Sequence, residues 1–151
     1  MSGLPGKLAI MLNGKLFPKI FYSLCLLVIL CIPSFADDVD DQALSAALSF
    51  TATIDDGNFQ AAYWMGSPLL QLMTSAEQWI DKADRTQRIL GKVLEREVKK
   101  LRTATSPAHF PDDEYRMIYF ESRAERKAKA AEVILLHRVD GLWRVCDYSI
   151  R

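Results

Sequence analysis

Hydrophobic residues recur every three or four positions between residues 41 and 90, which is the spacing of one face of an α-helix. The pattern predicts a first helix over 41–55, ended by a turn in which Gly57 suits a left-handed C-cap. The acidic run 37–41 before it, with four Asp in five residues, is predicted to be frayed. A second, short helix is predicted over 59–65. Its aromatic residues, which we expect to supply much of the core, are Phe59, Tyr63 and Trp64.

Two further helix starts are marked by residues that cap helices. Ser67 is followed by a proline, and these residue types are preferred at the N-cap and at the first helical position. Thr74 has Glu77 three residues later, which is the spacing of a capping box. The helix that begins there is predicted to run up to Gly91, with Trp79 on its apolar side.

The last third of the chain contains strand-forming runs separated by turn residues. Residues 115–120 are aromatic and β-branched, and 131–139 include four consecutive apolar residues, a run typical of a strand buried on both faces. The dipeptide at 140–141, Asp-Gly, is a two-residue hairpin signal, after which 142–150 is predicted to pair back as the final strand. The charged segment 123–129 is predicted to be the turn between the first two of these strands.

The segment 92–104 fits two structures. Its Lys, Glu, Arg and Leu content agrees with a continuation of the preceding helix. Thr103 and Thr105 instead suit a strand, and Gly91 is a poor residue for a helix interior. The pattern of residues leaves both structures open.

The N-terminal 36 residues have the pattern of an export signal. Three lysines precede an almost unbroken apolar run over 20–32, and small residues stand at the two positions that a signal peptidase reads. The predicted cleavage site is therefore the bond between Ala36 and Asp37. The apolar run is shorter than the roughly 20 residues that a transmembrane helix needs, although an uncleaved anchor is the alternative. Lipidation at Cys31 is disfavoured because the residue before it is bulky.

If the protein is exported, the signal defines both the domain boundaries and the cellular compartment of the mature protein. Residues 1–36 are the predicted signal peptide, and 37–151 are predicted to form a single domain in the periplasm or outside the cell. Its contact with the inner membrane is limited to the signal before cleavage. Removing the signal takes three of the 19 basic residues and none of the 19 acidic ones, which leaves a net charge of −3 and no electrostatic basis for binding nucleic acid. Cys146 is then the one cysteine left, so an internal disulfide is excluded.

Motifs spread along the predicted domain occur together in one family of short exported bacterial proteins. The most specific is the final strand with its Asp-Gly turn, residues 140–150. The others are residues 54–59 with Tyr63, 77–79, 90–91, 101–104, 111–115 and 131–133. With these motifs the chain resembles, over residues 57–151, the family catalogued as domain of unknown function 4019.

The resemblance implies an architecture and no activity. Helices followed by antiparallel strands are similar, by analogy, to the cone-shaped superfamily of nuclear transport factor two, in which a curved sheet wraps a long helix and leaves a pocket. The resemblance also implies that residues from about 94 to 106 form the first strand. The expected fold is therefore α+β, with N-terminal helices packed on one face of a four-stranded antiparallel curved sheet, in a cone-like arrangement.

Aromatic residues and a histidine are the candidates for lining such a pocket. Trp143 alternates with Val145 on the last strand, so its ring is either a pocket wall or a core plug, and the same two interpretations apply to the other tryptophans. His137 shares a strand face with three apolar residues and could shuttle protons beside an acid. The candidate lining is Trp143, His137, Tyr119, Trp79 and Trp64, with Glu132, Tyr115 and Tyr148 as polar neighbours of the histidine.

Charged residues add one candidate surface. The basic residues Arg123, Arg126, Lys127 and Lys129 form either a solvated sheet edge or a surface for an anionic partner. Cys146 has no base placed near it by the sequence and is interpreted as a buried strand cysteine. One histidine beside scattered carboxylates lacks a ligand cluster, so no catalytic residue, metal or cofactor is assigned.

These observations leave three hypotheses for function. The first is a non-enzymatic exported protein that binds a partner or a small ligand through the concave sheet. The second is an enzyme with a small pocket that uses His137 and an acid. The third is a structural module that forms a homodimer through the outer face of its sheet. The sequence names no ligand, substrate, partner or pathway.

Overall fold

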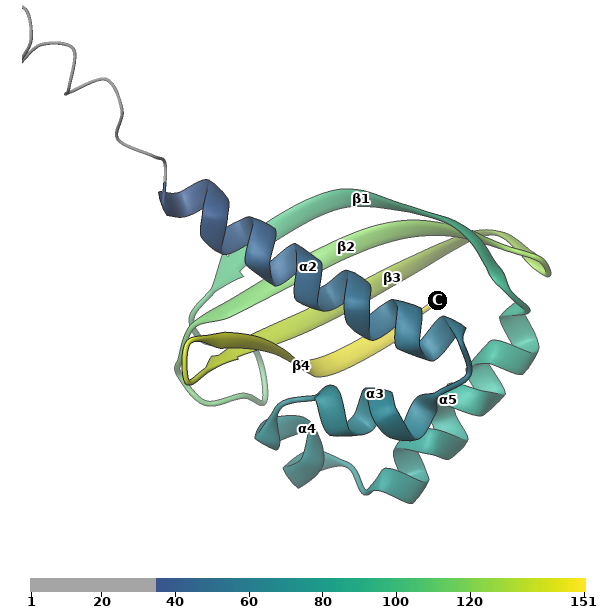
Figure 1. Cartoon of the computed structure of the whole chain (residues 1–151), viewed down its shortest axis with the longest axis horizontal. Helices are drawn as coiled ribbons and strands as arrows, with labels where there is room; N and C mark the ends of the chain where they lie inside the picture. Colours follow the sequence, from purple (N-terminus) through teal and green to yellow (C-terminus); the bar gives the residue numbers. More distant parts are fainter. Residues whose placement is uncertain (1–34) are drawn as a thin grey trace, which may run out of the picture. The chain divides into compact units, whose positions relative to one another are not determined.

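The structure, a computed structural model, describes residues 35–151 (Figure 1). The predicted signal segment up to residue 34 lies outside the described residues. In the described part of the chain, helices come first and strands follow. The helices are α2 (Phe35–Asp55), α3 (Phe59–Met65), α4 (Pro68–Met73) and α5 (Ala76–Leu90), and the strands are β1 (Val93–Ala104), β2 (Tyr115–Ala124), β3 (Lys127–Val139) and β4 (Leu142–Ile150).

The strands form one antiparallel sheet in the order β1-β2-β3-β4, so each strand pairs with its neighbour in sequence. Figure 1 shows the sheet curving over α2, which crosses it, while α3 and α4 lie on the β4 side and α5 lies next to α3. The predicted α+β fold with a four-stranded antiparallel sheet is confirmed. We call the face of the sheet toward α2 the inner face and the opposite face the outer face.

Helix α2 begins earlier than the sequence predicted. The acidic run 37–41, which was expected to be frayed, lies in its first turns. Acidic residues at a helix N-terminus interact favourably with the exposed backbone N–H groups. Asp40 is also tied to the sheet, since Arg116 Nε donates to its Oδ1 at 2.7 Å. The prediction of a frayed leader was therefore wrong, because it ignored a partner far away in the sequence.

Side-chain caps begin the next three helices. Ser67 accepts a hydrogen bond from the first turn of α4, as its residue type predicted, and Asn58 does the same for α3. The capping box of α5 is formed by Ser75 and Gln78, one position later than predicted. Thr74 is instead the C-cap of α4, and its N–H donates to Leu70. Two residues link α4 to α5. Because Thr74 ends α4, Ser75 is the residue that remains to cap α5.

Helix α5 stops at Gly91, and the ambiguous segment after it is strand β1, as the family resemblance implied. Gly91 has a φ of +72°, and a Cβ there would lie 2.8 Å from a carboxylate oxygen of Glu125. The segment 123–129 was predicted as a turn, but β2 and β3 extend into it and leave two turn residues, Glu125 and Arg126. Backbone hydrogen bonds from both to the α5–β1 junction hold this tight turn.

A β-bulge in β4 decides which of its side chains reach the core. Leu135 pairs with Asp147 and Leu136 pairs with Val145, so Cys146 is an extra residue. Trp143 and Val145 therefore lie on the inner face before the bulge, and Tyr148 returns to it afterwards. Cys146 faces outward, where it packs with Tyr115 and Leu135.

The main core lies between α2 and the inner face. Phe50 of α2 contacts both Trp79 and Tyr148, with ring centroids 5.8 and 6.0 Å apart. Trp79 and Trp143 are buried, as expected for core residues. Trp64 was also expected in the core, but 59% of its surface is exposed and its ring packs on the edge of Tyr63. Neighbouring residues of a helix point about 100° apart, so of this pair only Tyr63 faces inward.

Candidate functional site

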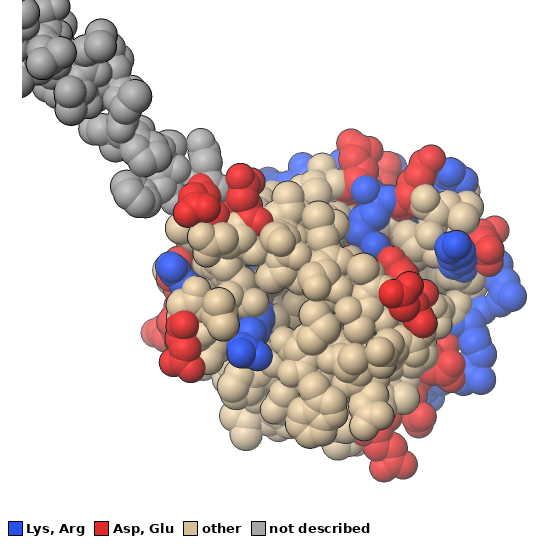
Figure 2. Space-filling view, in the orientation of Figure 1, with Lys and Arg blue, Asp and Glu red and all other residues tan. Residues whose placement is uncertain are grey.

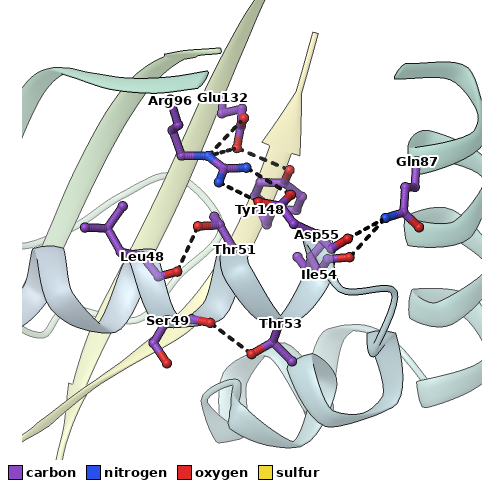
Figure 3. A network of polar contacts seen from close by, with 10 residues as sticks. All are labelled: Leu48, Ser49, Thr51, Thr53, Ile54, Asp55, Gln87, Arg96, Glu132 and Tyr148. Carbon is purple, nitrogen blue, oxygen red and sulfur yellow. Dashed lines mark hydrogen bonds and ion pairs between the residues drawn. The ribbon is translucent and has the colours of Figure 1, made fainter. Parts of the chain in front are cut away.

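A buried group of charged side chains lies where the end of α2 meets the inner face of the sheet (Figure 3). Glu132 of β3 is fully buried, and Arg96 Nε donates to both of its carboxylate oxygens at 3.2 Å. The terminal nitrogens of Arg96 donate to the carboxylate of Asp55 at 2.8 and 3.2 Å. Tyr148 donates its hydroxyl to Glu132 at 3.3 Å. We call these four residues the inner ion cluster.

The end of α2 is fixed so that Asp55 faces the sheet. Gln87 of α5 donates its amide to the backbone oxygens of Ile54 and Asp55, at 3.4 and 3.0 Å (Figure 3). The last carbonyl groups of a helix have no partner within it, so this side chain supplies one. Gly57, with a φ of +76°, then turns the chain away into α3. The position of Asp55 in front of Arg96 therefore depends on both α2 and α5.

The inner ion cluster is built to hold charge rather than to transfer protons. Burial raises the pKa of Tyr148 above its ordinary value, and the negative charge of Glu132 raises it further. Burial alone would lower the pKa of Arg96, but its hydrogen bonds to Asp55 and the charge of Glu132 outweigh that effect, so the pKa is raised. Tyr148 thus stays a neutral donor and Arg96 a cation. A general acid or base needs a pKa near the working pH, which neither group has.

Two small crevices border the inner ion cluster. One, of about 20 Å³, lies between the end of α2, α5 and the start of β1, with Asp55 and Tyr148 in its lining. The other, of about 90 Å³, lies between α5 and the end of β4, with Trp79, Lys82 and Tyr148 in its lining. Typical small-molecule sites have volumes of roughly 300–1,000 Å³. Side chains of the core therefore fill most of the concave space in which a pocket was expected.

A wider groove, of about 580 Å³, opens between α2 and the β3–β4 hairpin, and we call it the α2–hairpin groove. Small and polar side chains of α2 form one wall and the hairpin forms the other. Arg144 is the single charged residue among those that line it. The lining consists of Gln42, Ser45, Ala46, Ser49, Met65, Gly141, Leu142, Trp143 and Arg144.

The groove lies on a part of the molecule with few charges. Residues 42–76, which include most of α2 and all of α3 and α4, contain two charged residues, Asp55 and Asp56. Figure 2 shows a broad face without Lys, Arg, Asp or Glu side chains over these helices, with charged groups around its border. Several large apolar side chains are exposed on these helices and on the hairpin: Trp64, Met65, Leu72, Met73 and Leu142.

The tryptophans predicted to line a pocket have three different positions. Trp143 is buried and lines the α2–hairpin groove. The guanidinium carbons of Arg116 and Arg138 lie 5.0 and 5.7 Å from the centre of its ring, which holds the indole in place. Trp79 is buried beside the crevice at α5 and donates its indole N–H to the backbone oxygen of Phe59 at 3.2 Å. Trp64 is exposed on α3.

His137 lies on the outer face, on the opposite side of the sheet from both crevices. Its ring stacks on Tyr115, with centroids 5.0 Å apart, and its Nε2 lies 2.8 Å from Oδ2 of Asp113. The hydrogen bond to His137 lowers the pKa of Asp113. A histidine–acid pair is therefore present, but it fastens the loop between β1 and β2 to the sheet. Glu132 and Tyr148, which were expected beside His137, lie on the inner face.

The remaining predicted residues lie on or near the outer face. Tyr119 is half-buried there, with the guanidinium carbon of Arg102 5.9 Å from the centre of its ring. Two of the four basic residues proposed as an anionic-partner surface already have carboxylate partners. Arg123 binds Glu95 at 2.8 Å and Lys129 binds Glu121 at 2.5 Å. Arg126 donates to the backbone oxygen of Arg88, and Lys127 is exposed.

Cys146 is buried on the outer side of the bulge, and its thiol contacts the backbone oxygen of Leu135 at 3.4 Å. Burial raises the pKa of Cys146 to about 12. A thiol of that kind is almost wholly protonated at neutral pH and is a poor nucleophile. The interpretation of Cys146 as a buried strand cysteine is confirmed.

Comparison with known families decides the relationship that the motifs suggested. The family described as "Protein of unknown function (DUF4019)" matches residues 46–148. The chain belongs to the DUF4019 family. The matched region begins in α2 and ends in β4, so it contains the whole inner ion cluster and most of the α2–hairpin groove. A comparison with curated proteins found no match to this DUF4019 protein.

Sequence reasoning missed two parts of the site in this DUF4019 protein. Arg96 lies in a run of six charged residues in eight, 95–102, a pattern typical of a solvated sheet edge. The strand register shows that Arg96 faces inward, opposite the buried Ser122. The available signal was Glu132, a single acidic residue within the apolar strand β3, because a buried carboxylate requires a cation. The second missed part is the wall of the groove formed by α2, whose sequence shows no sign of a binding site other than its lack of charged residues.

The described residues contain neither a metal-binding cluster nor a membrane-spanning helix. Within residues 35–151, no group of three or more His, Cys, Asp or Glu side chains is arranged to hold a metal ion. No described helix of this DUF4019 protein is both long enough and apolar enough to span a bilayer.

Proposed function

We propose that this DUF4019 protein is exported and acts in the periplasm as a non-catalytic module that binds an apolar polypeptide segment in the α2–hairpin groove. The observation that carries this proposal is the groove itself, an open site of about 580 Å³ on a face with few charged side chains. The proposal moves the predicted binding site from the concave interior, which core side chains fill, to the rim of the sheet.

The shape and chemistry of the groove favour a polypeptide over a small molecule. Small-molecule sites usually enclose most of the ligand surface, whereas this groove is open along the side of α2. Leu142 and Met65 offer apolar contacts in the groove, and Trp64, which precedes Met65 on α3, adds an exposed apolar ring to that helix. Ser45 and Ser49 of the α2 wall can hydrogen-bond to the backbone of a bound segment.

The enzyme hypothesis has less support from the structure. The inner ion cluster contains groups whose pKa values lie far from neutral pH. His137 and Asp113 form a hydrogen-bonded pair, but they lie on the outer face, and His137 is absent from the linings of the cavities described above. A catalytic pair needs a site for substrate next to it.

Binding in the groove can be tested with one substitution and a matched control. Peptides selected from a displayed random library against the wild-type protein should be rich in apolar residues. Leu142→Asp places a charge in the groove, and Ile89→Asp places one at a comparably exposed position on α5. We expect roughly tenfold weaker peptide binding for Leu142→Asp, about 1.4 kcal/mol, and no change for Ile89→Asp, measured by fluorescence anisotropy. Selected peptides that bind both variants equally, or a library that yields none, would reject the proposal.

Export is tested separately. Cells that express the full chain should release the protein with the periplasmic fraction, and intact-mass spectrometry should give a chain that begins at Asp37. A protein that stays in the cytoplasm with Met1 or Ser2 at its start would contradict this half of the proposal. Recovery in the membrane fraction at full length would support the uncleaved anchor instead.

A further inference from the structure

Strand β1 has a free edge. It pairs with β2 on one side and, within the described residues, with no strand on the other. Figure 1 shows β1 forming one border of the sheet, away from α3 and α4. It is 12 residues long, and none of its side chains is buried. Such an edge carries a row of unpaired backbone N–H and C=O groups that can pair with another strand.

Strand β1 exposes both apolar and charged side chains. Leu94 and Val98 are exposed by 46% and 40%. Edge strands that resist pairing tend to be short or to carry charged side chains, Lys above all. Strand β1 is long and carries charges of both signs, so pairing depends on whether like or opposite charges meet across the edge. Here acidic residues occupy the first half of the strand and basic residues the second half, with Arg96 as the exception that is used inside the fold.

This distribution of charge is complementary to itself. When two copies of β1 are placed antiparallel with residue 98 opposite residue 99, Glu95 lies opposite Arg102 and Glu97 lies opposite Lys100. No pair of like charges occurs in that register. Moving the copies by one residue in either direction places like charges opposite each other: Lys99 opposite Lys99, or Arg96 opposite Lys100.

The bulge in β1 makes this register compatible with the pleat of the sheet. Residues directly opposite each other must point to the same face, and without a bulge residues 95 and 102 would point to opposite faces. The register shift between Val98 and Lys100 adds one residue to β1, so the side chains after it point to the opposite face from the one that strict alternation would give. Glu95 and Glu97 pair with Arg123 and Glu121 of β2, and the basic residues 100 and 102 pair with Tyr119 and Met117. All four charged residues therefore lie on the outer face.

From these features we infer that two copies of this DUF4019 protein associate through their β1 edges, antiparallel and with two-fold symmetry, into one continuous eight-stranded sheet. Each interface then contains two Glu95–Arg102 and two Glu97–Lys100 pairs on the outer face. On the inner side, Arg96 lies opposite Leu101 of the other copy. The α2–hairpin groove lies on the opposite edge of the sheet, so both copies keep it accessible, and this inference does not depend on the proposed function.

The association differs from a dimer formed through the outer face. That face carries ion pairs within the chain, including Glu95–Arg123 and Glu121–Lys129, which a flat face-to-face contact would have to desolvate. Edge pairing leaves them exposed to water. A carboxylate has about four lone-pair sites, so Glu95 can accept from Arg102 of the other copy while it retains Arg123.

A charge swap tests the inference. Glu97→Lys places two lysine side chains opposite each other, and we expect the dimer dissociation constant from sedimentation velocity to rise roughly tenfold or more. Adding Lys100→Glu to that variant restores opposite charges, so the double variant should return to nearly the wild-type constant. The matched control is Asp147→Lys, which reverses an exposed carboxylate on the outer face of the other edge strand and should have no effect.

A cross-link tests the register directly. The double variant Glu95→Cys/Arg102→Cys should form two disulfides between chains under mild oxidation, because directly opposite residues have the Cα separation that a disulfide needs. Within one chain these positions are roughly 23 Å apart along the strand, so an internal bond cannot form. Peptide mass spectrometry should identify the linkage from 95 to 102. A monomeric wild type, or a dimer that neither the charge reversal weakens nor this linkage joins, would overturn the inference.

Discussion

Arg96 and Glu132 are joined across an intervening strand: Nε of Arg96 in β1 donates to both carboxylate oxygens of Glu132 in β3, while β2 runs between them. The small Ser122 stands opposite Arg96 in β2, and Arg96 reaches over it along the inner face. Because Asp55 binds the other end of the same guanidinium, this arginine connects the edge strand, the centre of the sheet and the end of α2.

Removing one member of this pair should destabilise the fold strongly. Arg96→Met leaves the fully buried Glu132 without a cation, and breaking a buried pair in this way typically costs about 3–5 kcal/mol. Urea unfolding followed by circular dichroism measures the loss. The double variant Arg96→Met/Glu132→Met should recover much of it, since the charge that is still without a cation, on Asp55, is partly exposed to water. Equal losses in the single and double variants would show that the charge itself is not the cause.

Cys146 gives a prediction about alkaline pH. Its pKa is raised by burial from 9.0 to about 12, so above about pH 9 the unfolded chain loses a proton that the folded chain retains. The contribution of this thiol to stability is therefore complete below pH 9 and falls as the pH rises to about 12. Urea unfolding at pH 8 and pH 10.5 should show a smaller fall for Cys146→Ala than for the wild type. The native thiol should also resist alkylation at pH 8 and react once the protein is unfolded in urea.

Asp113 gives the opposite dependence at acid pH. The hydrogen bond to His137 lowers its pKa below 3.8, so the ionised carboxylate stabilises the folded state above pH 3.8, and that contribution is lost as the pH falls through the lowered value. Asp113→Asn should therefore lower the melting temperature near neutral pH, and the difference from the wild type should shrink toward pH 2. Hydrogen exchange should locate the effect in the loop between β1 and β2. A difference that stays constant with pH would exclude ionisation as its source.

The tryptophans should separate into core and surface residues. Trp79→Ala removes a buried ring that contacts Phe50 and Tyr148, and large-to-small changes of this kind cost about 3–5 kcal/mol. Trp64→Ala should change the free energy of unfolding by less than about 1 kcal/mol, because most of that ring is exposed. Acrylamide quenching provides the check in the folded state: Trp64 should account for most of the accessible fluorescence.

The sequence predicted those elements whose signals are local. The hairpin at Asp140 and Gly141 forms as expected, with φ angles of +51° and +79°, because few residue pairs adopt that turn readily. Gly91 ends α5 where its residue type predicted, and α3 ends at residue 65, as predicted. The final strand, residues 142–150, was predicted with its observed bounds.

The errors concern features that depend on distant partners or on a face that a short pattern cannot define. Asp40 was assigned to a frayed leader because its partner, Arg116, lies 76 residues away. Helix α3 has seven residues, fewer than two full turns beyond the cap, so the pattern could not tell Tyr63 from Trp64 as the inward residue. The α2–hairpin groove could not be predicted for the same reason. One of its walls comes from α2, and the other comes from the hairpin near the end of the chain.

The extra residue at Cys146 makes β4 tolerant of a one-residue deletion at this point. With Cys146 removed, Val145 would still pair with Leu136 and Asp147 with Leu135, so Tyr148 would keep its place on the inner face and its hydrogen bond to Glu132. The loss would fall on the outer face, where the thiol packs with Tyr115 and Leu135. A regular two-residue alternation would then replace the bulge, and the local twist of the strand would decrease.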